Sequence, residues 1–101
     1  MKLFAFYCRD GELAPQIRPK VRADHFAYLA EHADDYALGG PLLREEEPLG
    51  SLIIVKAADE AAARARFEGD PYYVSGVWQS INMTEFKALT GEWARALGLA
   101  E

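Results

Sequence analysis

The residues best suited to chemistry in this chain are His25 and its neighbours. On a predicted helix, His25 comes one position before Phe26, at the edge of the apolar face, and Arg22 lies one turn upstream on nearly the same side. An imidazole beside a fixed guanidinium could move a proton while the positive charge holds a carboxylate, phenolate or enolate. The alternative is a partly buried histidine bonded to backbone and a solvated arginine.

Asp70 is the second candidate. It stands between Gly69 and the pair Pro71-Tyr72, just beyond a predicted helix end, where a short rigid loop can direct a carboxylate at a pocket that Tyr72 lines. Aspartate before proline is also ordinary turn chemistry, and that interpretation stays open. If Asp70 meets His25, the carboxylate would accept the proton of one ring nitrogen, fix the tautomer and make the other nitrogen a better base.

The sequence offers little for other kinds of catalysis. His32 follows His25 by seven positions, about 10 Å along a helix, so both rings cannot bind one ion, and Cys8 is the only cysteine. We therefore expect no metal site, and we interpret Cys8 as a buried structural thiol. No serine stands in a Gly-x-Ser-x-Gly motif, and Gly39-Gly40-Pro41 lacks the lysine of a phosphate loop. We expect no cofactor.

Six main elements must position these residues. Aromatic and β-branched runs predict strands, whereas apolar residues at helical spacing and capping residues predict helices. The expected order is strand 2–8, helix 19–33, a second strand from 36 that bends at 39–41, strand 52–55, helix 60–67 and strand 74–84, with an exposed hairpin loop at 44–48 and a C-terminal helix at 90–99.

Local signals set the expected faces and ends of the two main helices. In the first, Phe26, Leu29, Ala30 and Ala33 recur at the spacing of one buried face. The second is expected to start at an Asp59 cap and to end at a left-handed Gly69, with Pro71 preventing its continuation.

This order predicts an α+β fold, the ferredoxin-like split βαβ arrangement with an antiparallel sheet and both helices on one face. In the first strand, Leu3, Ala5 and Tyr7 alternate with Phe4, Phe6 and Cys8, so both faces of the sheet are apolar. A second copy of the chain could cover the open face through a two-fold pairing of sheets. We therefore expect a homodimer, a dimeric α/β barrel.

Length and charge narrow the function further. The chain has 101 residues, half of them hydrophobic, and a net charge of -5. We expect one domain over 1–101, with its core at about 1–88 and a helical extension at about 90–99. Scattered basic residues and the acidic balance disfavour nucleic-acid and membrane partners. The first residues lack the apolar length of a signal peptide, so we expect a cytoplasmic protein.

Several short motifs, taken in order, resemble the YciI-like (YCII-related) family over about residues 1–88. They are Arg22-x-x-His25-Phe26-x-x-Leu29, Gly40-Pro41-Leu42, Gly50-Ser51, Asp59-Glu60-x-Ala62, Asp70-Pro71-Tyr72 and Ser75-Gly76-Val77. The stretch between Pro41 and Gly50 is shorter than in bacterial members, and a tail is added beyond Leu89.

The resemblance implies a ferredoxin-like domain that dimerises into an α/β barrel, with a cleft holding a His and an Asp, here His25 and Asp70. Most members have no established activity, and one branch removes chloride from chlorinated hydroxyquinones. The first hypothesis is a small cofactor-independent lyase or isomerase acting on an aromatic or enolisable compound, with Arg22 holding the anion. The alternatives are a non-catalytic dimeric module that binds a small metabolite and a purely structural dimer.

Overall fold

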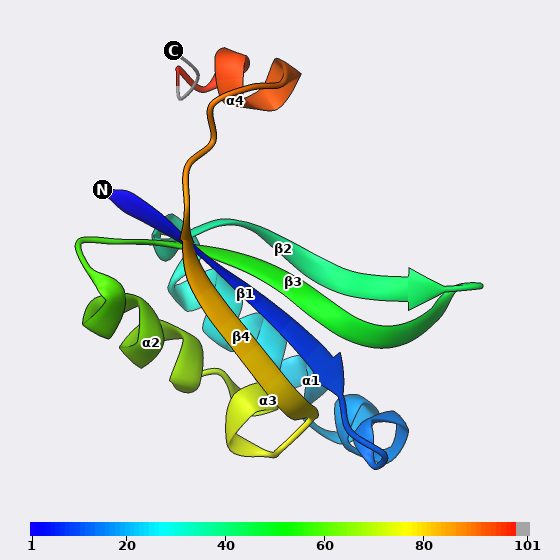
Figure 1. Cartoon of the computed structure of the whole chain (residues 1–101). Coiled ribbons are helices and arrows are strands. Elements are labelled where there is room, and N and C mark those ends of the chain that lie inside the picture. Colours follow the sequence, from blue (N-terminus) through cyan, green and yellow to red (C-terminus); the bar gives the residue numbers. More distant parts are fainter. Residues whose placement is uncertain (99–101) are drawn as a thin grey trace.

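The structure of the protein is a computed structural model that describes residues 1–98. Its elements follow the chain from the N-terminal strand to a short C-terminal helix (Figure 1). They are β1 (Lys2–Asp10), α1 (Ala14–Glu31), the 3-10 turn η1 (Ala33–Asp35), β2 (Tyr36–Arg44), β3 (Glu47–Ala57), α2 (Glu60–Glu68), α3 (Pro71–Val74), β4 (Trp78–Phe86) and α4 (Glu92–Ala96). Leu99, the last residue of the predicted C-terminal helix, lies outside the described residues.

The four strands form one antiparallel sheet in the order β2-β3-β1-β4. With β1 and β3 in the centre and a helix after each, this is the ferredoxin-like α+β fold that the element order predicts. Figure 1 shows α1, α2 and α3 on one face of the sheet and α4 beyond one of its ends. None of the helices among residues 1–98 is long and apolar enough to span a bilayer.

The two faces of β1 differ as the alternation predicts. Phe4, Phe6 and Cys8 are buried beneath the helices, whereas Tyr7 on the opposite face is 46% exposed. Phe6 stacks on Phe67 of α2 with ring centroids 4.2 Å apart, and Phe67 in turn stacks on Trp78 at 5.2 Å. This aromatic column joins α2 to the sheet and fixes the helix beside the centre of the core.

The helix α1 differs from the prediction in its start and in its buried face. It begins at Ala14, with proline in its first turn, so Pro19 lies inside the helix and the predicted start at that residue is wrong. Its buried residues are Ala14, Arg18 and His25, while Phe26 is 59% exposed. Hydrophobicity alone misplaced the face because two polar side chains are buried with carboxylate partners.

The segment after α2 also differs from the prediction. Asp59 caps α2 as expected, accepting from the backbone N–H of Ala62 at 2.8 Å. Gly69, however, has a right-handed φ of -79°. A glycine fits there because a Cβ would collide with the hydroxyl of Tyr28. Pro71 begins α3, so the last strand starts at Trp78 instead of Val74.

The β2–β3 hairpin is tighter than expected. Its turn is confined to Glu45 and Glu46, which have φ values of 50° and 71°, and β3 already begins at Glu47. The predicted loop at 44–48 is therefore mostly paired strand. The register of β2 shifts between Tyr36 and Leu38, and Gly39 is then paired with Ile53 of the central strand β3.

Candidate active site

A cavity of about 410 Å³ lies between α1 and the strands β2 and β3. Its walls are mainly apolar, and they include part of the α1 stripe that the sequence predicted to be core. The lining residues are Arg18, His25, Phe26, Leu29, Ala33, Tyr36, Leu38, Gly39, Gly40, Pro41, Ser51, Ile53 and Tyr72. A cleft of this volume, with apolar walls and a few polar groups, suits a small organic ligand.

The structure brings His25 and Asp70 together at this cavity. His25 Nδ1 lies 2.7 Å from Asp70 Oδ1, with 10% of the histidine side chain and none of the aspartate exposed. Asp70 is the N-cap of α3, and the same Oδ1 accepts the backbone N–H of Tyr72 at 2.8 Å. A carboxylate only accepts hydrogen bonds, so His25 donates from Nδ1 and keeps Nε2 as its basic nitrogen.

Tyr72 links this pair to a buried cation. Its ring stacks on the His25 imidazole with centroids 3.8 Å apart and planes within 3°. The Arg18 guanidinium carbon lies 5.2 Å from the centre of the Tyr72 ring. The order Arg18, Tyr72, His25 therefore places a positive charge and an imidazole around one aromatic side chain in the cavity wall.

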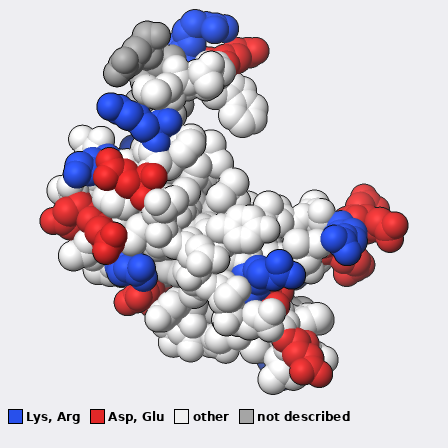
Figure 2. Space-filling model, viewed as in Figure 1, with Lys and Arg blue, Asp and Glu red and all other residues white. Residues whose placement is uncertain are grey.

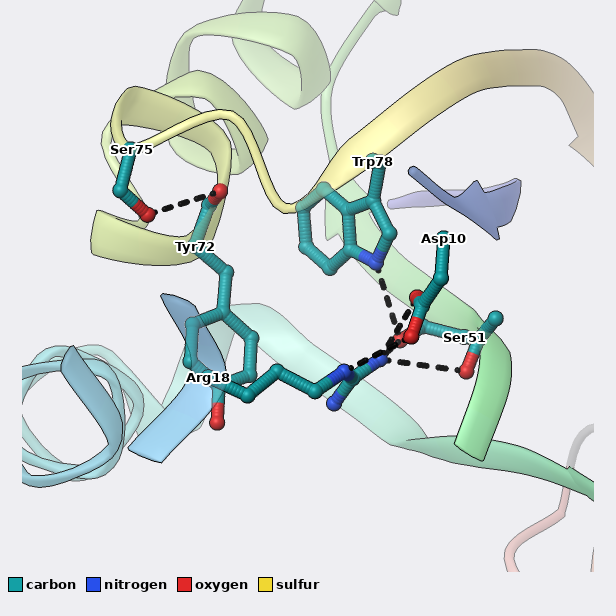
Figure 3. A network of polar contacts seen from close by, with 7 residues as sticks. Asp10, Arg18, Ser51, Tyr72, Ser75 and Trp78 are labelled. Atoms are coloured by element: carbon teal, nitrogen blue, oxygen red, sulfur yellow. Dashed lines mark hydrogen bonds and ion pairs between the residues drawn. The ribbon is translucent and has the colours of Figure 1, made fainter. Parts of the chain in front are cut away.

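Arg18 is held by a network of polar contacts (Figure 3). Its Nε and Nη2 each donate to one oxygen of Asp10 at 2.9 Å, and Nη2 also donates to Ser51 Oγ at 3.2 Å. The indole N–H of Trp78 donates to the same Ser51 oxygen at 3.2 Å. A two-point contact with a carboxylate fixes the guanidinium plane, so Arg18 is a rigid cation.

Arg22, which the sequence put forward as the cation, is exposed and does not line the cavity. The reason is helix geometry. At about 100° per residue, Arg18 lies about 20° from His25 around α1, whereas Arg22 lies about 60° away. Sequence reasoning missed Arg18, although its seven-residue spacing from His25 is the signal that could have found it.

Two buried side-chain oxygen atoms, one of them in the His25–Asp70 pair itself, have no hydrogen-bond partner among residues 1–98. They are Asp70 Oδ2 and the Tyr36 hydroxyl. Burial, followed by the negative charge of Asp70, raises the pKa of Tyr36 well above its ordinary value. The phenol is therefore neutral at physiological pH and retains its proton as a hydrogen-bond donor.

Cys8 is fully buried. Burial is the main cause that raises the pKa of its thiol to about 12, and the charges of Asp10 and Asp70 add to it. The thiol is therefore a poor nucleophile and a packing residue. Across the described part of the chain, no three His, Cys, Asp or Glu side chains are grouped so as to hold a metal ion.

Several solved structures are similar to this chain, among them those of two proteins from different organisms. One is the 5-chloro-2-hydroxyhydroquinone dehydrochlorinase of Burkholderia phenoliruptrix, solved in complex with 2,5-dihydroxybenzoquinone. It has a TM-score of 0.74 and 25% identity, over 84% of this chain and 93% of that one. The other, a protein from Agrobacterium tumefaciens, has a TM-score of 0.50 and 19% identity over 86% and 92%, and it shows only the shared fold.

Among curated proteins, none matches this chain in sequence. The family model for the YCII-related domain, in contrast, matches residues 2–87, which span all four strands and the helices α1, α2 and α3. The motifs that suggested the YciI-like family lie within that range. The match and the ferredoxin-like sheet agree, and the chain belongs to the YCII-related domain family.

Proposed function

We propose that this protein is a cofactor-independent lyase that moves a proton on a hydroxylated aromatic or enolisable small molecule. The observation that carries the proposal is the buried contact of 2.7 Å between His25 Nδ1 and Asp70 Oδ1 at the wall of an apolar cavity. A carboxylate that orients an imidazole in this way stabilises the imidazolium formed when the other nitrogen takes a proton.

In the proposed step, His25 Nε2 accepts the proton of a ring hydroxyl or an acidic C–H bond. The substrate reacts as its keto tautomer, in which the ring carbon that bears the leaving group is tetrahedral. The electron pair released by the proton forms a new double bond, and the leaving group departs as an anion with its bonding electrons. Where the proton came from oxygen, the adjacent ring double bond also shifts to the carbon that bears the leaving group. Arg18 takes the role first considered for Arg22, because its guanidinium lines the cavity and is fixed by Asp10. A rigid positive charge stabilises an anion without reorganising as the anion forms.

The similar dehydrochlorinase supports an aromatic substrate class. That protein was solved with 2,5-dihydroxybenzoquinone bound, and it shares the fold over most of both chains. In this chain the cavity combines aromatic and aliphatic walls with the polar groups of Arg18, His25 and Ser51. A flat ring carrying oxygen substituents matches this combination, since the ring fits the apolar walls and its oxygens can reach the polar groups.

We also propose that the protein acts as a homodimer through the open face of the sheet. Ile54 is only 8% exposed on that face, with Leu52 and Ala5 near it half-buried. Figure 2 shows that charged side chains on this view lie mainly towards its edges, leaving much of the centre uncharged. An isologous sheet-to-sheet contact would bury this surface on both copies.

The test of the catalytic proposal is chloride release from 5-chloro-2-hydroxyhydroquinone and related halogenated hydroquinones. We expect turnover by the native protein and a loss of about 10²-fold to 10⁴-fold in kcat for His25→Gln, the usual contribution of general acid–base catalysis. His32→Gln is the matched control, because His32 is the C-cap of the same helix and does not line the cavity.

Full turnover by His25→Gln would remove the assignment. Tight binding of the same compounds by calorimetry without any turnover would instead favour the non-catalytic metabolite-binding module.

A further inference from the structure

One residue of β2 that lines the cavity, Gly39, has no side chain. Gly39 is paired with Ile53, a buried residue of β3 that lines the cavity. Directly paired residues of antiparallel strands project to the same face of a sheet. A side chain at position 39 would therefore stand on the helix-covered face, in the floor of the cavity beneath α1.

The surroundings of Gly39 leave room for such a side chain. A Cβ built there would have Ile53 Cγ1 at 3.4 Å, and Ile53 Cα and the Leu52 carbonyl oxygen at 3.5 Å. These are ordinary van der Waals contacts, and all three nearest atoms belong to β3, beside the site. The backbone at Gly39 also lacks the positive φ that would require glycine. Nothing in the fold itself demands a glycine at this position.

Gly40 provides the contrast. Its backbone also lines the cavity, but it is paired with Leu52, so by strand alternation an added side chain would project to the opposite face of the sheet, away from the cavity. A Cβ at Gly40 would meet no heavy atom within 4 Å. The two adjacent glycines thus differ in the face to which an added side chain would point, while they lie in the same strand and neither has a positive φ.

Opposite this floor, α1 supplies the roof. Phe26 and Leu29 line the cavity from the helix, and Pro41 lines it from farther along β2. Phe26 is 59% exposed, so its ring borders open space instead of packing into the core. Three cavity-lining residues of β2, namely Tyr36, Gly39 and Pro41, are paired with buried residues of β3, and of these three only Gly39 has no side chain.

We propose that Gly39 is the specificity-determining position of the cavity, and that the ligand is a single-ring aromatic compound whose ring lies against the Gly39 backbone beneath Phe26. The aromatic class of ligand rests on the proposed function, whereas the role of Gly39 in forming the space does not. A large apolar residue at position 39 would fill the space and exclude the ring without disturbing the backbone.

The experiment follows the Ile53 δ1-methyl resonance by NMR while benzene is added to the whole protein. Benzene reports the space for a ring independently of catalysis and of polar groups. We expect the native protein and Gly40→Ala to respond alike, and the apparent benzene affinity of Gly39→Leu to fall at least tenfold. Gly39→Ala, which adds a single methyl group, should fall between them.

Thermal unfolding shows whether the fold is kept. We expect the Tm of Gly39→Leu to be equal to or above that of the native protein, because the new side chain fills apolar space. If Gly39→Leu unfolds, Gly39→Ala alone decides the question. The proposal fails if the folded Gly39 variants bind benzene like the native protein, if Gly40→Ala loses as much affinity, or if Ile53 of the native protein does not respond.

A second titration, with 2,5-dihydroxybenzoquinone, separates this proposal from the proposed function. Stronger binding of the quinone than of benzene, lost in Gly39→Leu, supports both. If the benzene pattern holds but the quinone binds no better than benzene, the catalytic proposal loses its support while the role of Gly39 stands.

Discussion

Two arginine–aspartate pairs of equal length serve different purposes in this molecule. Arg18 and Asp10 join α1 to β1 with contacts of 2.9 Å, and each side chain is only 10% exposed. Arg66 and Asp35 join α2 to η1 at the same 2.9 Å, but with 32% and 37% of the side chains exposed. The contact distance is equal, so the difference lies in how much water surrounds the charges.

This difference decides what each pair can do. The Arg66 pair is screened by water, and together with Tyr28, which donates to the Arg66 carbonyl at 2.7 Å, it fastens α1 to α2. The Arg18 pair lies in the cavity wall, where a fixed charge acts strongly on a ligand and where losing one partner leaves an uncompensated buried ion. The pair that is more sensitive to the loss of a partner is therefore the one at the cavity.

The largest effect is expected when the buried pair is broken. Asp10→Ala leaves the Arg18 guanidinium buried without its carboxylate, and we expect the free energy of unfolding to fall by about 3–5 kcal/mol. Urea denaturation followed by circular dichroism measures this loss. A fall below about 1 kcal/mol would mean that water reaches Arg18 and that the two pairs are energetically alike.

The next largest effect is expected at the His25–Asp70 pair. Asp70→Asn removes the carboxylate that accepts the Nδ1 proton of His25, so the ring nitrogen resonances of His25 in NMR should shift as the second tautomer becomes populated. If the proposed function holds, kcat should fall by about 10²-fold or more, because the tautomer is no longer fixed. Unchanged ring nitrogen resonances would show that the carboxylate does not hold the tautomer of the imidazole.

A smaller effect concerns the pH dependence of stability through Cys8. Its pKa is raised from 9.0 to about 12 in the folded protein, so folding favours the protonated thiol. The stabilisation is complete below pH 9 and is lost as the pH rises towards 12, by about 1 kcal/mol at pH 10. Comparing the alkaline unfolding of the native protein with that of Cys8→Ala isolates this loss. Equal curves for the two proteins would contradict it.

The smallest effect is expected at the exposed pair. Asp35→Ala should lower the free energy of unfolding by about 0.5 kcal/mol or less, and 1 M salt should reduce even this difference. The same urea experiment that is used for Asp10→Ala measures it. A loss as large as that of Asp10→Ala would show that the two arginine–aspartate pairs do not differ in energy as their exposure predicts.

The sequence by itself determined the element order, the ferredoxin-like sheet and two residues of the proposed site. The alternation in β1 and the β-branched run of β3 are local patterns. Both strands form as predicted because a pairing shifted by one residue would move their buried apolar side chains to the other face of the sheet. His25 could be named as a candidate because the chain has only two histidines, and Asp70 because it stands in a short loop just beyond a predicted helix end.

Only the tertiary structure decided which residues meet. The contact between His25 and Asp70 spans 45 positions, and the burial of Arg18 depends on Asp10 and Ser51 approaching from two strands. The apolar stripe that begins at Phe26 was expected to be core, yet it borders the cavity because Gly39 leaves the floor opposite it empty. Hydrophobic periodicity records that a face is apolar, whereas the packing of distant strands determines whether that face touches protein or encloses a space.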